Sequence, residues 1–129
     1  MSAPESLVKG TDFVAVSCKD FGAAVDFYEN TLGLPLSVRY GQMPGAEFET
    51  GNLTIAVLQS EAFDIEPRAN NHPIALRVDD VHAARAELEA RGVAFLSDTI
   101  DSGVCHMAPF QDPEGNTFLL HHRYAPRAS

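Results

Sequence analysis

The stretch Asp112-Pro113-Glu114-Gly115-Asn116, which leads into the apolar run Thr117-Phe118-Leu119-Leu120 and then His121-His122-Arg123, decides how this chain folds. The proline ring fixes φ, so Asp-Pro opens a turn, and Gly-Asn is expected to supply the positive φ that reverses the chain. The apolar run that follows is typical of a buried strand. The stretch therefore predicts a tight turn followed at once by a strand.

The same entry into a strand occurs earlier in the chain, at Gly51-Asn52 before residues 53–58. An offset of 64 residues superimposes the two Gly-Asn pairs and places Ile55 over Leu119. An offset of 60 aligns two upstream segments, and it pairs Val14 with Ile74, Val16 with Leu76, Asp20 with Asp80 and Phe21 with Val81. Strand and cap patterns are common enough to coincide, but two matches in the same order indicate an internal repeat.

Each copy of the repeat reads as a strand, a helix and three strands. The copies cover about residues 10–59 and 73–124, and the polar, turn-rich segment 60–72 links them within one domain of residues 1–129. Asp20 and Asp80 have the character of helix N-caps, and Gly33 and Gly92 of helix ends. Alternation and helical spacing predict strands at 11–18, 37–40, 46–50, 53–59, 74–78, 93–96, 103–110 and 117–122, and helices at 21–32 and 81–91.

Composition narrows the class of protein. The 129 residues are 45% apolar, which is enough for one domain with its own core. The formal net charge of −9 makes nucleic acid a poor partner, because phosphate binding requires clustered Lys and Arg. No window approaches the ~20 apolar residues of a membrane span, so a cytoplasmic protein is expected. Cys18 and Cys105 are expected to be reduced and buried, although a disulfide between them stays open.

Three segments of the chain resemble the signature of a known family. They are residues 13–20 (FVAVSCKD), residues 24–34 (AVDFYENTLGL) and residues 112–116 (DPEGN). In this order they are similar to the vicinal oxygen chelate superfamily, which contains glyoxalase I, bleomycin-resistance proteins and extradiol ring-cleaving dioxygenases. The resemblance covers nearly the whole chain and indicates a fold more firmly than an activity.

The resemblance implies an α+β fold. Two βαβββ modules would form a U-shaped mixed sheet of eight strands, with the helices on the convex side and a ligand pocket on the concave face. It also implies a homodimer.

Catalytic members of the superfamily hold a divalent metal with His, Glu or Gln side chains from equivalent strands of the two modules, and the resemblance assigns those four positions here to Phe13, Ile55, Pro73 and Leu119. None of these side chains has a donor atom for a metal. His72 lies one position before Pro73, but strand alternation points it to the wrong face. No metal cofactor is therefore expected, unless other ligands are used.

The remaining histidines could supply chemistry. His121 shares a strand face with Leu119 and is expected to point into the concave pocket. If the turn pairs Phe110 with Thr117, His106 lies opposite His121. Two facing histidines could bind a metal or act as a general base, but a cross-strand pair that only packs is the more common arrangement.

Other polar residues are candidates for the same pocket. Arg77 alternates with apolar neighbours and could clamp an anion, or it could be an exposed strand residue neutralised by Asp79 or Glu49. Helix capping accounts for Asp79 and Asp80. The complete expected pocket consists of Phe13, Ser17, Tyr40, Glu49, Ile55, Arg77, His106, Leu119 and His121.

Two functions from different classes follow. The first is a metal-independent protein that binds a planar or amphipathic small molecule in an apolar pocket. The second is a lyase-like or dioxygenase-like enzyme that uses noncanonical metal ligands, or His121 or His106 as a base. The four positions without donor atoms favour binding.

Overall fold

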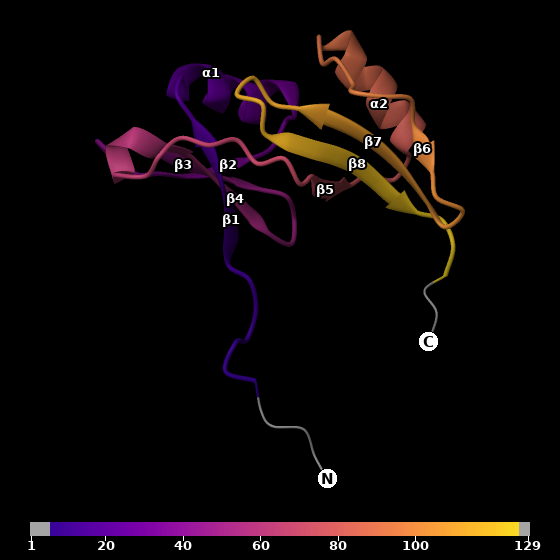
Figure 1. The fold of residues 1–129 in the computed structure, drawn as a ribbon, viewed down its shortest axis with the longest axis horizontal. Helices are drawn as coiled ribbons and strands as arrows, with labels where there is room; N and C mark the ends of the chain where they lie inside the picture. The colour runs from indigo at the N-terminus through magenta and orange to yellow at the C-terminus, as the bar shows by residue number, and fades with distance from the viewer. Residues whose placement is uncertain (1–5, 127–129) are drawn as a thin grey trace.

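The computed structural model of the protein describes residues 6–126 (Figure 1). Its strands are β1 (Phe13–Cys18), β2 (Leu36–Arg39), β3 (Gly45–Glu49), β4 (Thr54–Gln59), β5 (Ile74–Arg77), β6 (Ile100–Asp101), β7 (Cys105–Gln111) and β8 (Thr117–Arg123). Its helices are α1 (Phe21–Asp26), which continues as a π-helical turn over Phe27–Thr31, and α2 (Val81–Ala90). A single 3₁₀ turn, Ser60–Phe63, follows β4.

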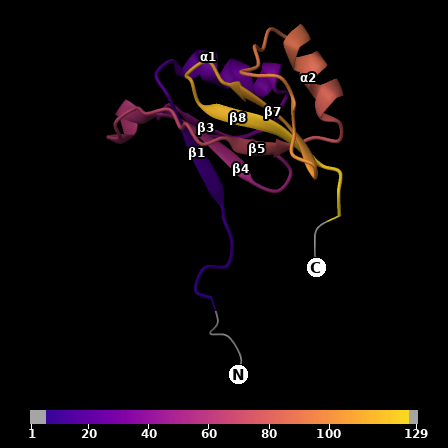
Figure 2. The ribbon, with the colours of Figure 1, turned by 45° about the vertical axis from the view of Figure 1, so that its right-hand side comes forward.

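The eight strands form two mixed sheets of four, with the orders β1-β4-β3-β2 and β5-β8-β7-β6. In each sheet the first strand pairs parallel with the last, and the other neighbours are antiparallel. Figures 1 and 2 place α1 and α2 on the same side of the strands. The prediction of an α+β fold built from two βαβββ modules is confirmed.

Both helices begin where the sequence predicts. The carboxylates of Asp20 and Asp80 accept hydrogen bonds from the backbone N–H of Ala23 and Ala83, each at 3.1 Å. These bonds satisfy donors that the first helical turn leaves without partners. The chain leaves the helical segments through Gly33 and Gly92, whose φ values of +73° and +94° are accessible to glycine without strain.

The offset between the modules differs from the predicted 64 residues. Val14 pairs with Ile55 in the first sheet, and Ile74 pairs with Phe118 in the second, so the last strands align at an offset of 63. The equivalent of Leu119 is therefore Ala56, and the assignment to Ile55 was wrong by one residue. The two turns place Gly-Asn differently: Asn116 directly precedes Thr117, the first paired residue of β8, whereas Leu53 separates Asn52 from Thr54 of β4.

Two other local predictions are corrected. The expected strand at 93–96 is only a single bridge from Phe95 to Phe110, and the edge strand of this sheet is β6 instead. In the two Gly-Asn turns only the glycines, Gly51 and Gly115, have positive φ. Within residues 6–126, Asp64 is the one residue other than glycine in that region.

The core lies between the sheets and the helices. Four aromatic side chains at its centre are fully buried, with 0% of their surface exposed: Tyr28, Phe48, Phe110 and Phe118. The Tyr28 ring packs against Phe48 of the first sheet and Phe118 of the second, with centroids 5.6 and 5.9 Å apart. Tyr28, in the π-helical turn that continues α1, thus joins both modules into a shared core. Burial of such aromatic rings is a main source of stability.

Cys18 and Cys105 are both buried and unbridged, so the disulfide that the sequence left open does not form. Neither helix within residues 6–126 has the length and apolar character to cross a membrane.

Candidate functional site

The turn that predicts the fold lies at the boundary between the two modules. Asp112 is buried, and its carboxylate accepts hydrogen bonds from the Tyr28 hydroxyl and from the Asn116 side-chain amide. The same carboxylate accepts the backbone N–H of Glu114 at 2.9 Å and of Asn116 at 2.8 Å. These four hydrogen bonds occupy the lone pairs of the buried carboxylate. Asp112 is therefore held in one position and is not free to bind a metal or a substrate.

Further bonds from this turn reach across to the first module. Asn116 Nδ2 donates to the carbonyl oxygen of Ser17 at 2.8 Å. The Glu114 carboxylate accepts the backbone N–H of Lys19 at 2.9 Å and of Asp20 at 3.0 Å, just before α1 begins. The turn from Asp112 to Asn116 therefore serves the fold, by attaching the second module to β1 and α1 of the first.

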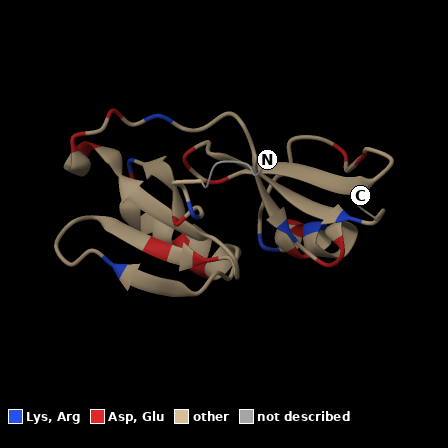
Figure 3. Cartoon of the chain, turned by 90° about the horizontal axis from the view of Figure 1, so that it is seen from below, with Lys and Arg blue, Asp and Glu red and all other residues tan. Residues whose placement is uncertain are grey.

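The face of both sheets that points away from the helices, here called the open face, carries most of the residues that were predicted to line the pocket. Strand alternation places apolar side chains along the middle of it, with acidic groups on the first sheet and basic groups on the second. Figure 3 looks onto this side of the molecule. The open face on the paired strands includes Phe13, Ala15, Ser17, Glu47, Glu49, Thr54, Ala56, Leu58, Ala75, Arg77, Met107, Pro109, Thr117, Leu119 and His121.

The superfamily's metal positions can be tested on this face. Phe13 and Leu119 lie on it, as does Pro73 by alternation with Ala75. Ile55 does not: it is 1% exposed and lies on the helix side, paired with Val14. The residue of the first module that lies at the position equivalent to Leu119 is Ala56.

Phe, Ala, Pro and Leu side chains offer a metal no lone pair, so these positions do not fit the superfamily's metal centre. Among residues 6–126, no group of three or more His, Cys, Asp or Glu side chains is arranged to hold a metal ion.

The predicted pair of His106 and His121 is wrong. Gln111, not Phe110, pairs with Thr117, and this shift sets His121 opposite Met107 and His106 opposite His122. His121 stays on the open face, beside Arg77 of β5.

His106 faces the helix side and does not belong to the open face. Its ring lies 5.1 Å from that of His82 on α2, and its Nε2 is 3.6 Å from the Asp101 carboxylate. No sequence pattern connects His82 with His106, because only the packing of α2 on β7 brings them together. His121 and His106 therefore cannot act jointly as a base or a ligand pair.

The polar candidates of the first sheet bond to one another. Ser17 Oγ lies 2.6 Å from Ser60 Oγ, and the Tyr40 hydroxyl donates to Glu47. Desolvation, and then the bond to Glu47, raise the pKa of Tyr40 to about 12. Glu49 accepts hydrogen bonds from Ser37 at 2.5 Å and Thr54 at 2.7 Å, and these hold its pKa below the ordinary value. Both groups keep their usual charge at neutral pH, so neither is tuned as an acid or base.

The predicted pocket residues are thus divided. Phe13, Ser17, Tyr40 and Glu49 belong to the first module, and Arg77, Leu119 and His121 to the second. Ile55 and His106 point to the helix side of their sheets.

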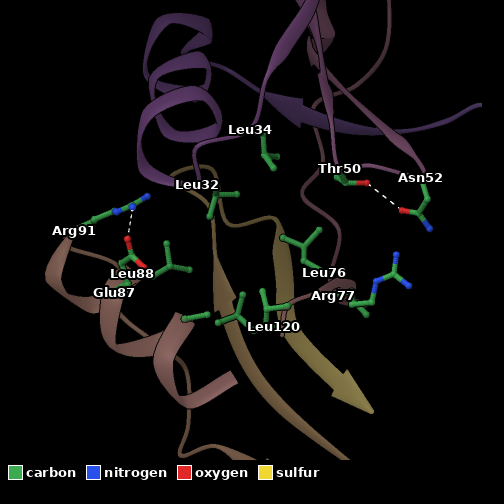
Figure 4. Close-up of a pocket in the computed structure, with 13 residues that line it drawn as sticks. Leu32, Leu34, Thr50, Asn52, Leu76, Arg77, Glu87, Leu88, Arg91 and Leu120 are labelled. Atoms are coloured by element: carbon green, nitrogen blue, oxygen red, sulfur yellow. Dashed lines mark hydrogen bonds and ion pairs between the residues drawn. The ribbon is translucent and has the colours of Figure 1, made fainter. Parts of the chain in front are cut away.

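A cavity of about 410 Å³ that the sequence analysis missed lies on the helix side, where the modules meet (Figure 4). We call it the junction cavity. Its leucines looked like ordinary core positions in the sequence, since no periodicity reports how two modules fit together. It is lined by Leu32, Leu34, Thr50, Asn52, Ala75, Leu76, Arg77, Val78, Ala84, Glu87, Leu88, Arg91 and Leu120.

Solved structures share this architecture. TnmS3, an antibiotic binding protein from Streptomyces sp. CB03234, is 25% identical, with a TM-score of 0.78 over 92% of this chain and 99% of that one. A glyoxalase/bleomycin resistance protein/dioxygenase superfamily member from Sphaerobacter thermophilus DSM 20745 is 22% identical, with a TM-score of 0.78 over 90% of this chain and 98% of that one.

Sequence relatives agree with this result. The uncharacterized protein YwbC of Bacillus subtilis (strain 168) is 28% identical over 101 residues, which is 73% of this chain and 80% of that protein. The family model for the Glyoxalase/Bleomycin resistance protein/Dioxygenase superfamily matches residues 10–120. The signature segments and the two-module fold lie within that match, and the chain belongs to this superfamily.

Proposed function

We propose that this protein binds a planar or amphipathic small molecule on its open face, without a metal. The observation that carries the proposal is the set of side chains at the superfamily's metal positions: Phe13, Ala56, Pro73 and Leu119. An aromatic ring and a branched aliphatic chain offer dispersion contacts in place of coordination. A lyase or dioxygenase of this superfamily would need donor atoms at the same positions.

The polar groups near these apolar side chains suit orientation of a ligand more than catalysis. His121 stands on the same strand face as Leu119 and lies beside Arg77. One imidazole at the edge of an apolar surface can direct a ligand by a single hydrogen bond. The similarity to an antibiotic binding protein at 25% identity and a TM-score of 0.78 supports the same class of function.

We also propose that a second copy of the chain completes the pocket. Phe13 is 53% exposed on the open face, which is unusual for a large aromatic side chain that has no partner surface. Glu47 and Glu49 lie on the open face of the first sheet, and His121 lies on that of the second. A homodimer in which each first sheet faces the partner's second sheet would place these polar groups opposite one another. Light scattering is expected to give twice the chain mass of 14.0 kDa, and a monomer at high concentration would contradict this arrangement.

A ligand screen tests the function. Antibiotics and metabolites with planar or amphipathic bodies are added to the protein, and its melting temperature is measured, since a ligand that binds only the folded state raises it. At a concentration of 100 times Kd the stabilisation is about 2.7 kcal/mol. Leu119→Arg should abolish the shift because it places a charge on the apolar surface.

Leu7→Arg is the matched control, because Leu7 is 97% exposed and lies before β1, outside both sheets. A ligand that stabilises Leu119→Arg and Leu7→Arg equally would show that binding occurs elsewhere. The absence of any stabilising compound would remove the support for a binding function.

A further inference from the structure

The internal repeat allows two corners of the molecule to be compared. At the first corner, the turn from Asp112 to Asn116 meets β1 and the continuation of α1, and Tyr28, Asp112 and Asn116 fill the space. At the corresponding second corner, the turn around Gly51 meets β5 and α2. An offset of 60 residues places Leu88 at the position of Tyr28, and Arg77 at that of Ser17.

The second corner is hollow, and this hollow is the junction cavity. The turn around Gly51 is one residue shorter than its counterpart, and Leu88 is smaller than tyrosine and has no hydroxyl. The space that a buried carboxylate and a phenol ring occupy at the first corner therefore stays open at the second. Its volume of about 410 Å³ lies in the range of small-molecule sites.

The walls of the junction cavity are apolar. Figure 4 shows leucines from both modules around it, contributed by the segment after α1, by β5, by α2 and by β8. They are Leu32, Leu34, Leu76, Leu88 and Leu120.

The rim of the cavity is polar and includes two arginines. Arg91 is already occupied: it contacts Glu87 at 2.6 Å and donates to the carbonyl oxygen of Thr31 at 2.8 Å, which ties α2 to the first module. Glu87, the acidic residue of the lining, is neutralised by the same contact.

Arg77, unlike Arg91, has no partner for its guanidinium among residues 6–126: the group makes no hydrogen bond or ion pair to another residue there. In Figure 4 its guanidinium extends toward the side of the cavity where Asn52 lies. Thr50 and Asn52, whose side chains lie 3.3 Å apart, provide a hydroxyl and an amide on that side.

We infer that the junction cavity binds a small carboxylate with an aromatic or branched apolar body. The carboxylate would pair with Arg77, whose planar guanidinium can hold both oxygens, and the body would pack among the leucines. The first corner supports this chemistry, because the protein itself fills the equivalent space with a carboxylate, Asp112, and an aromatic ring, Tyr28. The leucines of this site lie on the helix side, and Arg77, at the end of β5, also belongs to the open face.

Binding of 3-phenylpropionate, measured by titration calorimetry and by NMR shifts of the leucine methyl groups, tests the inference. The neutral 3-phenylpropanamide serves as the matched ligand, because it has the same body without the charge. The acid is expected to bind at least about tenfold more tightly than the amide, since a hydrogen bond to a charged group contributes more than a neutral one. Shifts are expected at Leu32, Leu76 and Leu88.

Two variants locate the site. Arg77→Gln should weaken binding of the acid by about tenfold or more and leave binding of the amide unchanged. Leu88→Phe should fill the cavity and abolish binding of both compounds. Arg39→Gln is the control, because Arg39 is an exposed arginine of β2 that does not line the cavity.

Several outcomes would overturn the inference. They are no detectable binding of 3-phenylpropionate, equal affinity for acid and amide in the unaltered protein, or full binding by Leu88→Phe. The comparison of the two ligands needs no variant, so it decides the question even if Arg77→Gln fails to fold. Leu119→Arg, which blocks the open face, should bind 3-phenylpropionate normally. A loss there would place the carboxylate on the open face instead.

Discussion

At the scale of single residues, the bond between Tyr28 and Asp112 joins the two modules inside the core. Burial of the phenol, followed by the negative charge of Asp112, raises the pKa of Tyr28 far above its ordinary value. Ionisation of Tyr28 would place two negative charges side by side in a space without water. The folded state therefore requires a protonated Tyr28.

The raised pKa has a defined sign for stability. In the unfolded chain Tyr28 loses its proton near pH 10, while in the folded chain it keeps the proton. The contribution of this group is complete below pH ~10 and is lost as the pH rises above that value.

Tyr28→Phe tests this account. The substitution should lower the free energy of unfolding at pH 7 by about 1–3 kcal/mol, because Asp112 loses a donor in a buried place. It should also flatten the fall in stability above pH ~10. Urea unfolding at pH 7 and above pH 10 measures both effects. Tyr124→Phe is the control, because its hydroxyl bonds to Asp101 at an exposed position. An equal loss in both variants would contradict the role of Tyr28.

At the scale of secondary-structure elements, the predictions that depend on local chemistry are confirmed, and those that depend on the register of strand pairing are wrong. The caps Asp20 and Asp80, the glycines Gly33 and Gly92, and the order of the elements were predictable, because each depends on local chemistry. The offset between the modules and the facing of His106 and His121 were not. Each required the pairing of two strands across a turn, and one extra residue in that turn reverses the face of every side chain after it.

The short helix α1 depends on support from outside its own sequence. It has six residues before the π-helical turn, too few to be stable alone, and the Glu114 carboxylate accepts the N–H groups of Lys19 and Asp20 just before it begins. A carboxylate at this end also interacts favourably with the helix dipole.

Glu114→Ala should therefore destabilise the protein by about 0.5–2 kcal/mol, the range for loss of a helix cap. Chemical unfolding at pH 7 measures the effect. Glu29→Ala removes an exposed carboxylate elsewhere on the same segment and should change stability by no more than about 0.5 kcal/mol. If both variants behave alike, Glu114 does not hold α1.

At the scale of the whole molecule, the family and the two-module fold were predictable from residues 13–20, 24–34 and 112–116. Three of the four positions assigned from the resemblance, Phe13, Pro73 and Leu119, lie on the open face, whereas the fourth, Ile55, was wrong by one residue. The junction cavity was not predictable. It arises from the difference between two turn lengths and from the way α2 meets the segment after α1, and neither leaves a periodic signal. The two modules differ at the turn around Gly51, and this difference leaves a cavity that a small molecule could fill.

The proposal that this superfamily member binds small molecules without the usual metal is tested by the metal content of the purified protein. The protein is purified without chelator, incubated in turn with Ni, Zn, Mn and Fe salts, desalted, and analysed by atomic emission. Because Phe13, Ala56, Pro73 and Leu119 offer no donor atoms, no stoichiometric metal is expected under any of these conditions. One tightly bound metal ion per chain, lost on substitution of a residue of the open face, would contradict the proposal.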